Sequence, residues 1–153
     1  MKLVTTLLAV EDIKESRKFY EKIFNQKVIL DFGENISFEG GLALQEKFDK
    51  LVDIPKDSII RKSNNIELYF EVDDFDSFMN KLRDYKNIKY VHPPKTHSWK
   101  QRVVRIYDPD FHIIEIGESM SVIAKRYVDK GLSVDKTAEL IQHPVDFVNN
   151  AID

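Results

Sequence analysis

Apolar residues fill two stretches of the chain without a helical period, at residues 2–10 and residues 66–72. Runs of this kind predict strands, and residues 2–10 predict a strand that is buried on both faces. After each run, apolar residues recur at helical spacing, which predicts helices over about residues 13–24 and 74–85. The same order of strand and helix therefore occurs twice.

The two copies are aligned by the residues that join strand to helix. Val10–Ile13 and Val72–Phe75 hold the same place in each copy and lie 62 residues apart. Internal similarity at a fixed period indicates related structural units. Three short strands are predicted after each helix, at residues 27–31, 35–39 and 41–45 in the first copy and at residues 88–92, 101–107 and 113–117 in the second.

Each copy is thus a βαβββ unit, and the fold class is α+β. One helix would cover one face of a four-stranded sheet, and the other face would be left to curve around a ligand. The predicted units span about residues 1–45 and 65–118 of a domain at residues 1–118, with a polar linker at 46–64. Residues 119–153 predict a helical extension, with helices at 122–130, 134–142 and 145–152.

Charge excludes some partners. The chain of 153 residues has a net charge of −3 and a pI near 5.8, so its overall field favours neither nucleic acid nor anionic membranes. Leu132–Leu140 looks like the first helix of a helix-turn-helix, but residues 118–153 carry a net charge of −2, which is unfavourable for DNA binding. We expect a packing or dimer element there.

Two further absences bear on chemistry and location. The chain has no cysteine, which excludes disulfides, thiolate nucleophiles and zinc sites built on cysteine. The apolar start is followed directly by Glu11 and Asp12 without a small-residue cleavage site, so we expect a mature first strand and a cytoplasmic protein.

Carboxylates on strands are the first candidates for chemistry. Alternation in residues 66–72 directs Glu67, Tyr69 and Glu71 away from the helix, which fits either a solvated face or a ligand-facing one. Glu115 lies among isoleucines in the last predicted strand of the second copy. A buried carboxylate is costly unless it is paired, protonated, hydrogen-bonded or bound to a metal, so Glu115 needs a partner.

The motif Arg105–Glu115, with Asp108-Pro109-Asp110 at its centre, adds a family resemblance to this pattern. Together with the βαβββ repeat and the Val-x-Asp start of each helix, it resembles the vicinal oxygen chelate superfamily. That superfamily includes glyoxalases, bleomycin and fosfomycin resistance proteins, and extradiol dioxygenases. The resemblance covers about residues 1–118 and implies a small-molecule ligand and a homodimer in which paired units form cups.

In metal-using members the resemblance implies a divalent ion inside the cup. The positions that correspond to its ligands are Thr5, Glu67 and Glu115, with Ala43 or Gln45 where a fourth ligand can stand. Thr5 and Glu67 hold places that are often histidine in such members. A site of Glu67, Glu115 and Gln45 would bind the ion through oxygen atoms only, and this suits Mg²⁺ or Mn²⁺ better than Zn²⁺ or Fe²⁺.

Two functions stay open at this point. The first is a metal-dependent enzyme of the lyase or transferase type, in which Glu115 is a ligand or base and Glu67 is its partner. The second is a non-enzymatic protein that binds or sequesters a small molecule without a metal, as in drug resistance. In that case two close glutamates would raise one of their pKa values by repulsion.

Residues 97–102 predict a lid over the cup, or alternatively a surface loop anchored by the only tryptophan. The expected substrate contacts are Tyr69, His97, Trp99 and Arg102. His112 is predicted to be a structural hydrogen-bonding residue rather than a ligand. Phe111 stands where the family usually has glycine, and a left-handed conformation there would cost about 1–2 kcal/mol.

Overall fold

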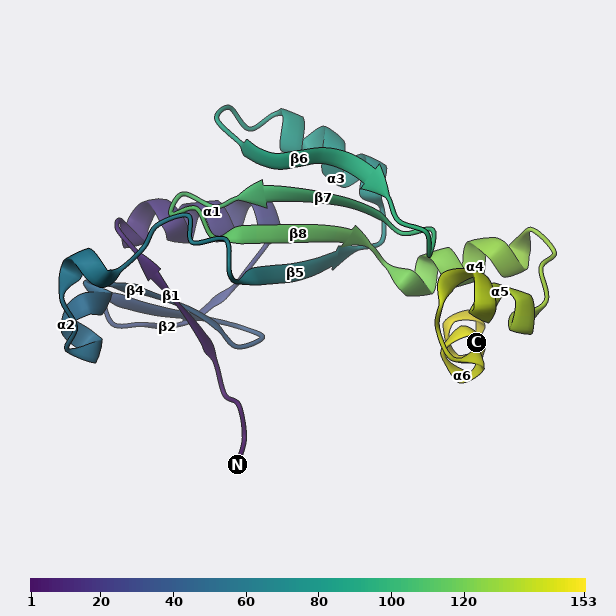
Figure 1. Cartoon of the computed structure of the whole chain (residues 1–153), viewed down its shortest axis with the longest axis horizontal. Helices are drawn as coiled ribbons and strands as arrows, with labels where there is room; N and C mark the ends of the chain where they lie inside the picture. Colours follow the sequence, from purple (N-terminus) through teal and green to yellow (C-terminus); the bar gives the residue numbers. More distant parts are fainter. The chain divides into compact units, whose positions relative to one another are not determined.

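The computed structural model describes all 153 residues, coloured along the chain in Figure 1. The chain divides into two compact units, one made of residues 1–66 and 107–112, the other of residues 67–106 and 113–153. Each unit contains one four-stranded mixed sheet, which confirms the α+β class and the paired βαβββ modules. None of the helices has the length and apolar content needed to cross a lipid bilayer.

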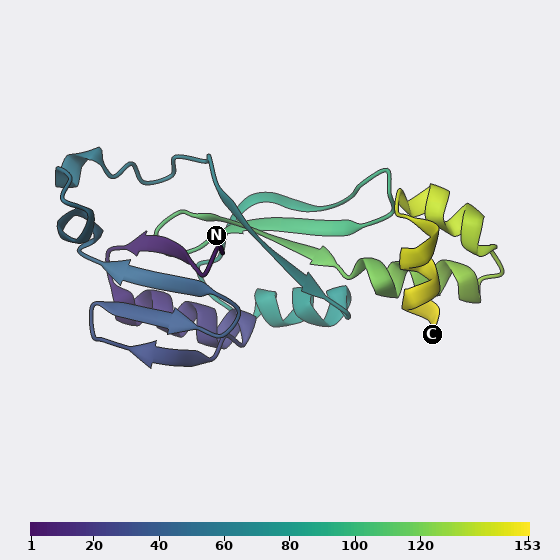
Figure 2. The same ribbon diagram turned by 90° about the horizontal axis from the view of Figure 1, so that it is seen from below.

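The first unit is built on the sheet β1-β4-β3-β2. Its strands are β1 (Thr6–Val10), β2 (Val28–Asp31), β3 (Asn35–Phe38) and β4 (Leu42–Glu46). β1 is parallel to β4, and the other pairs are antiparallel. Helix α1 (Ile13–Phe24) packs against β3 and β4, as Figure 2 shows. The side chain of Asp12 caps it by accepting hydrogen bonds from the amides of Lys14 and Glu15.

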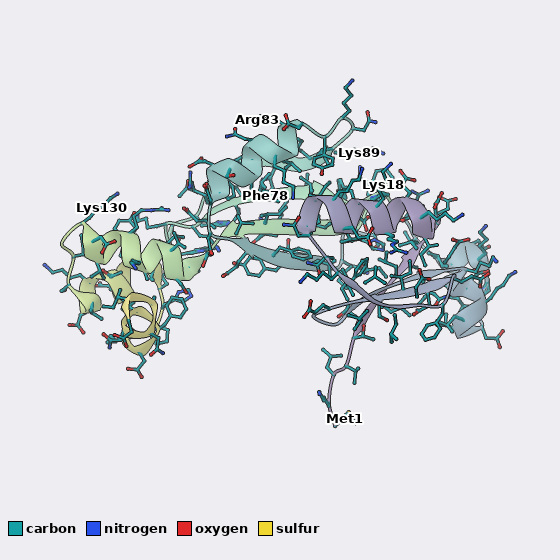
Figure 3. All side chains as sticks on the ribbon, turned by 180° about the vertical axis from the view of Figure 1, so that it is seen from behind. Met1, Lys18, Phe78, Arg83, Lys89 and Lys130 are labelled. Atoms are coloured by element: carbon teal, nitrogen blue, oxygen red, sulfur yellow. The ribbon has the colours of Figure 1, made fainter.

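The second unit repeats this topology as β5-β8-β7-β6. Its strands are β5 (Glu67–Val72), β6 (Lys89–Thr96), β7 (Arg102–Tyr107) and β8 (Ile113–Glu118). β5 is parallel to β8. Helix α3 (Phe75–Arg83) buries Phe75, Phe78, Met79 and Leu82, and Phe78 is labelled in Figure 3. Both helices form where the apolar spacing predicted them, because residues at that spacing lie on one side of a helix and can be buried together.

Three helices follow the second sheet. They are α4 (Met120–Asp129), α5 (Val134–Ile141) and α6 (Val145–Ile152), and they pack against one another at the end of the chain (Figure 1). Their bounds confirm the predicted helices to within about two residues. The buried cluster between them consists of Met120, Ile123, Ala124, Ala138, Ile141 and Val148. This extension therefore has an apolar core of its own.

Three expectations need correction. The first strand begins only at Thr6, and the preceding Leu3 and Val4 are 86% and 75% exposed, because the pairing with β4 starts at Thr6. The linker at 46–64 contains a short helix, α2 (Phe48–Val52), and a 3₁₀ turn, η1 (Lys56–Ser58). Finally, β6 continues through two prolines to Thr96, which is tolerated because β6 is an edge strand.

Candidate functional site

Five polar side chains lie on the face of the second sheet that points away from α3, and we call this group the polar face: Glu67, Tyr69, Glu71, Arg105 and Glu115. The exposure of β5 alternates, with its odd-numbered residues more exposed. Tyr69 is the register partner of Glu115 across β5 and β8, so the two side chains share one face. The two carboxylates that sequence reasoning singled out therefore lie on the same side of the same sheet.

Arg105 joins the two carboxylates of the polar face. Its Nε donates a hydrogen bond to Glu67 Oε2 at 2.7 Å, and its Nη2 forms an ion pair with Glu115 Oε2. Glu115 is only 8% exposed, so an ionised carboxylate there requires this cation. Nη1 of Arg105 also lies 3.2 Å from Nε2 of His92 on β6. The guanidinium is thus fixed from three sides.

One oxygen of this cluster is incompletely satisfied. Glu115 Oε2 is buried and receives no hydrogen bond of ordinary geometry, although it contacts the guanidinium of Arg105. A buried oxygen in this condition is unusual in proteins and often marks a place where another group binds. The contact with Arg105 Nη2 balances the charge of this oxygen.

A second network surrounds Tyr69. Gln101 is 4% exposed and donates from Nε2 to the Tyr69 hydroxyl at 2.8 Å. Trp99 Nε1 donates to Gln101 Oε1 at 3.0 Å, and the Tyr69 hydroxyl donates to Glu71 Oε1 at 2.8 Å. Partial burial and then the hydrogen bond to Glu71 raise the pKa of Tyr69 to about 12. Tyr69 is therefore a neutral phenol at physiological pH and does not act as a base.

The segment between β6 and β7 holds two aromatic rings together. The imidazole of His97 stacks on the indole of Trp99 with centroids 4.1 Å apart. Burial, followed by the positive charges of Lys95 and Arg105, lowers the pKa of His97, so its ring is neutral at pH 7. The rings form a flat, uncharged surface. Trp99 is at the same time packed against the helical cluster of the extension, which fixes its position.

Arg102 was predicted to contact substrate, but the structure does not bring it to the polar face. Alternation along β7 turns Arg102 and Arg105 to opposite faces. The guanidinium of Arg102 pairs with Asp76 of α3 and with Glu118, and it lies 5.0 Å from the centre of the Phe75 ring. Sequence reasoning missed Arg105 and Gln101. The signal for Arg105 was available, since Glu115 required a cationic or hydrogen-bonding partner.

The remaining predicted metal ligands belong to the first unit. Thr5 Oγ1 donates a hydrogen bond to the carbonyl of Gly41 at 2.9 Å. Gln45 is buried, accepts a hydrogen bond from Asn35 and donates one to the carbonyl of Glu46. Within either unit, no group of three or more His, Asp or Glu side chains is placed to hold a metal ion. A divalent ion at these positions stays a prediction.

The turn at residues 108–112 belongs to the first unit and is structural. Asp108 is buried and accepts hydrogen bonds from the Tyr20 hydroxyl at 2.8 Å and from the backbone amide of His112. Burial lowers the pKa of His112, but the hydrogen bond between its Nδ1 and Asp108 and the negative charges of Asp108 and Asp110 together outweigh burial and raise the pKa overall. His112 thus forms hydrogen bonds within the turn, as predicted. Phe111 has φ 68°, the left-handed conformation that the sequence pattern suggested.

The first unit also contains a pocket of about 410 Å³ that the sequence did not predict. It lies where the parallel strands β1 and β4 end, beside α2. Val10, Phe48 and Ile59 contribute apolar surface, while Arg61 and the buried Asp110 contribute charge. Sequence reasoning could not find it, because it is formed partly by the segment that was assigned to a linker.

Comparison with known proteins places this geometry in a family. The model of the glyoxalase-like domain matches residues 3–121 of the chain. A solved structure of a protein of unknown function from Agrobacterium tumefaciens is 35% identical, with a TM-score of 0.68, over 78% of this chain and 95% of that chain.

Two other solved structures share the fold at lower identity. A glyoxalase/bleomycin resistance protein/dioxygenase family enzyme from Burkholderia phytofirmans has 15% identity and a TM-score of 0.67, over 77% of this chain and 98% of its own. A genomically encoded fosfomycin resistance protein from Listeria monocytogenes has 19% identity and a TM-score of 0.61, over 78% of this chain and 94% of its own. These likenesses support the fold and not a particular reaction.

Proposed function

Because the chain belongs to the glyoxalase-like domain family, we propose that it binds a small organic molecule on the polar face of the second sheet and sequesters it without a metal ion. The observation that carries this proposal is the guanidinium of Arg105 between Glu67 and Glu115. The guanidinium neutralises the charge of these carboxylates in the way that a bound metal ion otherwise would.

The polar face has the composition of a small-molecule site. Such sites combine apolar or aromatic surface with a few fixed polar groups. The side chain of Tyr69 is accessible, since the residue is 49% exposed, and the stacked rings of His97 and Trp99 offer further flat surface. The ion pairs of Arg105 hold the charged groups in place before a ligand arrives, which lowers the entropic cost of binding.

A divalent ion does not fit the second unit as it stands. An ion bound to Glu67 and Glu115 would lie beside the guanidinium of Arg105, and the two positive charges would repel each other. Binding would require Arg105 to leave both carboxylates. The oxygen atoms of Thr5 and Gln45, which the family resemblance adds to the set, already take part in hydrogen bonds within the first unit.

One observation favours a second candidate function, a lyase or transferase-type enzyme that uses Mg²⁺ or Mn²⁺. Glu115 Oε2 is buried, and its contact with the guanidinium of Arg105 does not have ordinary hydrogen-bond geometry. Carboxylate oxygens of this kind are preferred ligands of both ions. In this case Glu115 and Glu67 would hold the ion once Arg105 had turned away, and the ion would polarise an oxygen of the substrate.

Metal content and ligand binding separate the two candidates. We compare the wild type, Glu67→Gln and Glu115→Gln, with Glu39→Gln as a control at an exposed glutamate of the first unit. Each protein is purified without chelator, dialysed against Mg²⁺ or Mn²⁺ and analysed for bound metal. A melting-temperature screen against small metabolites then identifies a ligand, since binding to the native state raises the melting temperature.

The proposal expects less than one ion per chain in all four proteins. It also expects a metabolite that stabilises the wild type and the control but stabilises Glu115→Gln clearly less. Stoichiometric metal that is lost in both site variants, and retained in the control, would instead establish the second candidate. Ligand binding that is unchanged in both site variants would remove the polar face from the function.

The expected homodimer is part of the same proposal. Edge strand β2 and the residue after it expose Ile29, Leu30 and Phe32 by 60%, 50% and 71%, and exposed apolar side chains on an edge strand support association with a second copy. A cytoplasmic location is likewise proposed, on the basis of the sequence pattern alone.

A further inference from the structure

The orientation of the Gln101 side chain is fixed by chemistry. The indole N–H of Trp99 can only donate, so the amide group must turn its oxygen, Oε1, toward Trp99. The carbonyl oxygen of Glu118 can only accept, so Nε2 must face Glu118, which it does at 3.0 Å. Two independent partners thus require the same orientation. The second N–H of the amide is then directed at the Tyr69 hydroxyl.

This orientation determines the direction of the hydrogen bonds at Tyr69. The phenolic oxygen accepts the N–H of Gln101 at 2.8 Å, and its own proton points to the carboxylate of Glu71 at 2.8 Å. A phenol has one proton and two acceptor positions. Since the proton and one acceptor position are used, the Tyr69 hydroxyl can offer only its remaining acceptor position to another molecule.

Gly117 makes this arrangement possible. It is the β8 residue opposite Glu71, and a Cβ atom there would lie 2.6 Å from Gln101 Nε2 and 3.0 Å from the Tyr69 hydroxyl. Any other residue would push the two side chains apart. The absence of a side chain at Gly117 therefore gives Gln101 and Tyr69 the space to meet above the strand.

We infer that Gln101 is a positioning residue which holds Tyr69 as a hydrogen-bond acceptor, so that the ligand of the polar face presents a hydrogen-bond donor to Tyr69 and Glu71. This inference rests on the proposed function and narrows its ligand class to molecules with a hydroxyl, amide N–H or ammonium group. The negative charge of Glu71 favours a positively charged donor over a neutral one.

The helical extension contributes to the same arrangement. Trp99 packs against the buried cluster of α4, α5 and α6, while its indole N–H holds the amide of Gln101. The extension thus anchors one end of the chain of contacts Trp99–Gln101–Tyr69–Glu71. This gives the extension a role in ligand recognition that the sequence did not indicate.

Three fragments that share a phenylethyl group test the donor requirement: 2-phenylethylamine, 2-phenylethanol and 2-phenylethyl methyl ether. The first is a charged donor, the second a neutral donor and the third only an acceptor. Binding is followed by NMR on the indole N–H resonance of the single tryptophan, which is unambiguous, and on the amides of β5 and β8. The proteins are the wild type, Tyr69→Phe, Glu71→Gln and Gln101→Leu.

The inference expects both donors to bind the wild type about two- to tenfold more tightly than the ether, which is the range for one net hydrogen bond. Tyr69→Phe removes most of this preference, and Glu71→Gln weakens the amine more than the alcohol. Gln101→Leu reduces the preference with Tyr69 still present, which a purely structural role would not produce. Tyr69→Phe and Glu71→Gln change exposed positions and should fold, so these two variants still test the inference if Gln101→Leu fails to fold.

Equal binding of the ether and the donors, or a donor preference that survives in Tyr69→Phe, overturns the inference while the proposed function stands. If none of the three fragments shifts these resonances, the inference also fails. The proposed function is then decided separately by the metal analysis and the metabolite screen.

Discussion

The two sheets share one topology but differ in chemistry at matching positions. Leu7 pairs with Ala43 in the first sheet, and Tyr69 pairs with Glu115 at the corresponding place in the second. The backbone register is the same, yet one pair is apolar and the other polar. The repeat therefore specifies how the strands are joined, while single substitutions at these positions specify where a ligand can bind.

The ends of the last strands show the same contrast. Glu46 ends β4 and Glu118 ends β8, and each pairs with the valine that ends the parallel strand beside it. Glu46 is half-buried, and its carboxylate accepts a hydrogen bond from the amide of Ile13 at the start of α1. Glu118 is fully buried and pairs with Arg102 and Arg126. In the second unit this carboxylate connects the sheet to the helical extension.

Substitution of these two glutamates should produce the largest difference between the units. Glu118→Gln removes the buried carboxylate that Arg102 and Arg126 share, and we expect the free energy of unfolding to fall by about 1.5–3 kcal/mol, the range for hydrogen bonds to charged groups. Glu46→Gln weakens one hydrogen bond and should cost about 1 kcal/mol. Urea unfolding followed by circular dichroism measures both. Equal losses in the two variants would show that the ion pairs of Glu118 stabilise the fold no more than the single hydrogen bond of Glu46 does.

The stability difference between the wild type and Glu118→Gln should also depend on pH. Burial raises the pKa of Glu118, but the hydrogen bonds from Arg102 and Arg126 outweigh it and hold the pKa below the ordinary value of 4.5. A carboxyl group with a lowered pKa stabilises the folded state above its unfolded pKa, and this contribution is lost as the pH falls through the folded pKa. The stability difference between wild type and Glu118→Gln should be full at pH 7 and shrink below about pH 4.5.

Most of the fold could be predicted because its signals are local. The apolar stripe of α1 and its Asp12 cap set the predicted helix at residues 13–24, and the observed helix is Ile13–Phe24. The exposure of Leu3 and Val4 could not be predicted, because it depends on where the pairing of β1 with β4 begins. An apolar pattern indicates that a residue can be buried, but it does not show where the pairing with the neighbouring strand begins.

The candidate site could be predicted only in part. Alternation placed Glu67, Tyr69 and Glu71 on one face, because the side-chain period of a strand is fixed, while the register of β5 with β8 adds Glu115 to that face. The choice of Arg102 over Arg105 ignored the same alternation in β7. The role of Gln101 could not be predicted, since two of its three partners, Tyr69 and Glu118, are distant in the sequence and are brought together by the pairing of β5 with β8.

A smaller effect distinguishes the two hydrogen bonds at Tyr69. Glu71 raises the pKa of this tyrosine and Gln101 lowers it, because the N–H of Gln101 stabilises the phenolate. From about 12, the pKa should therefore fall in Glu71→Gln and rise in Gln101→Leu. NMR titration of protein with ¹³C-labelled tyrosine rings measures both shifts. Changes of the same sign in the two variants would contradict the hydrogen-bond directions on which the donor requirement depends.

The contrast between the two sheets is tested most directly by mapping where a ligand binds. A metabolite identified in the melting-temperature screen is titrated into ¹⁵N-labelled protein, and the backbone amide shifts are recorded residue by residue. We expect the largest shifts around Tyr69 in β5 and Glu115 in β8, with small shifts around Leu7 and Ala43. Shifts confined to the first sheet, or to the pocket around Val10 and Phe48, with β5 and β8 unchanged, would contradict the assignment of the polar face as the binding site.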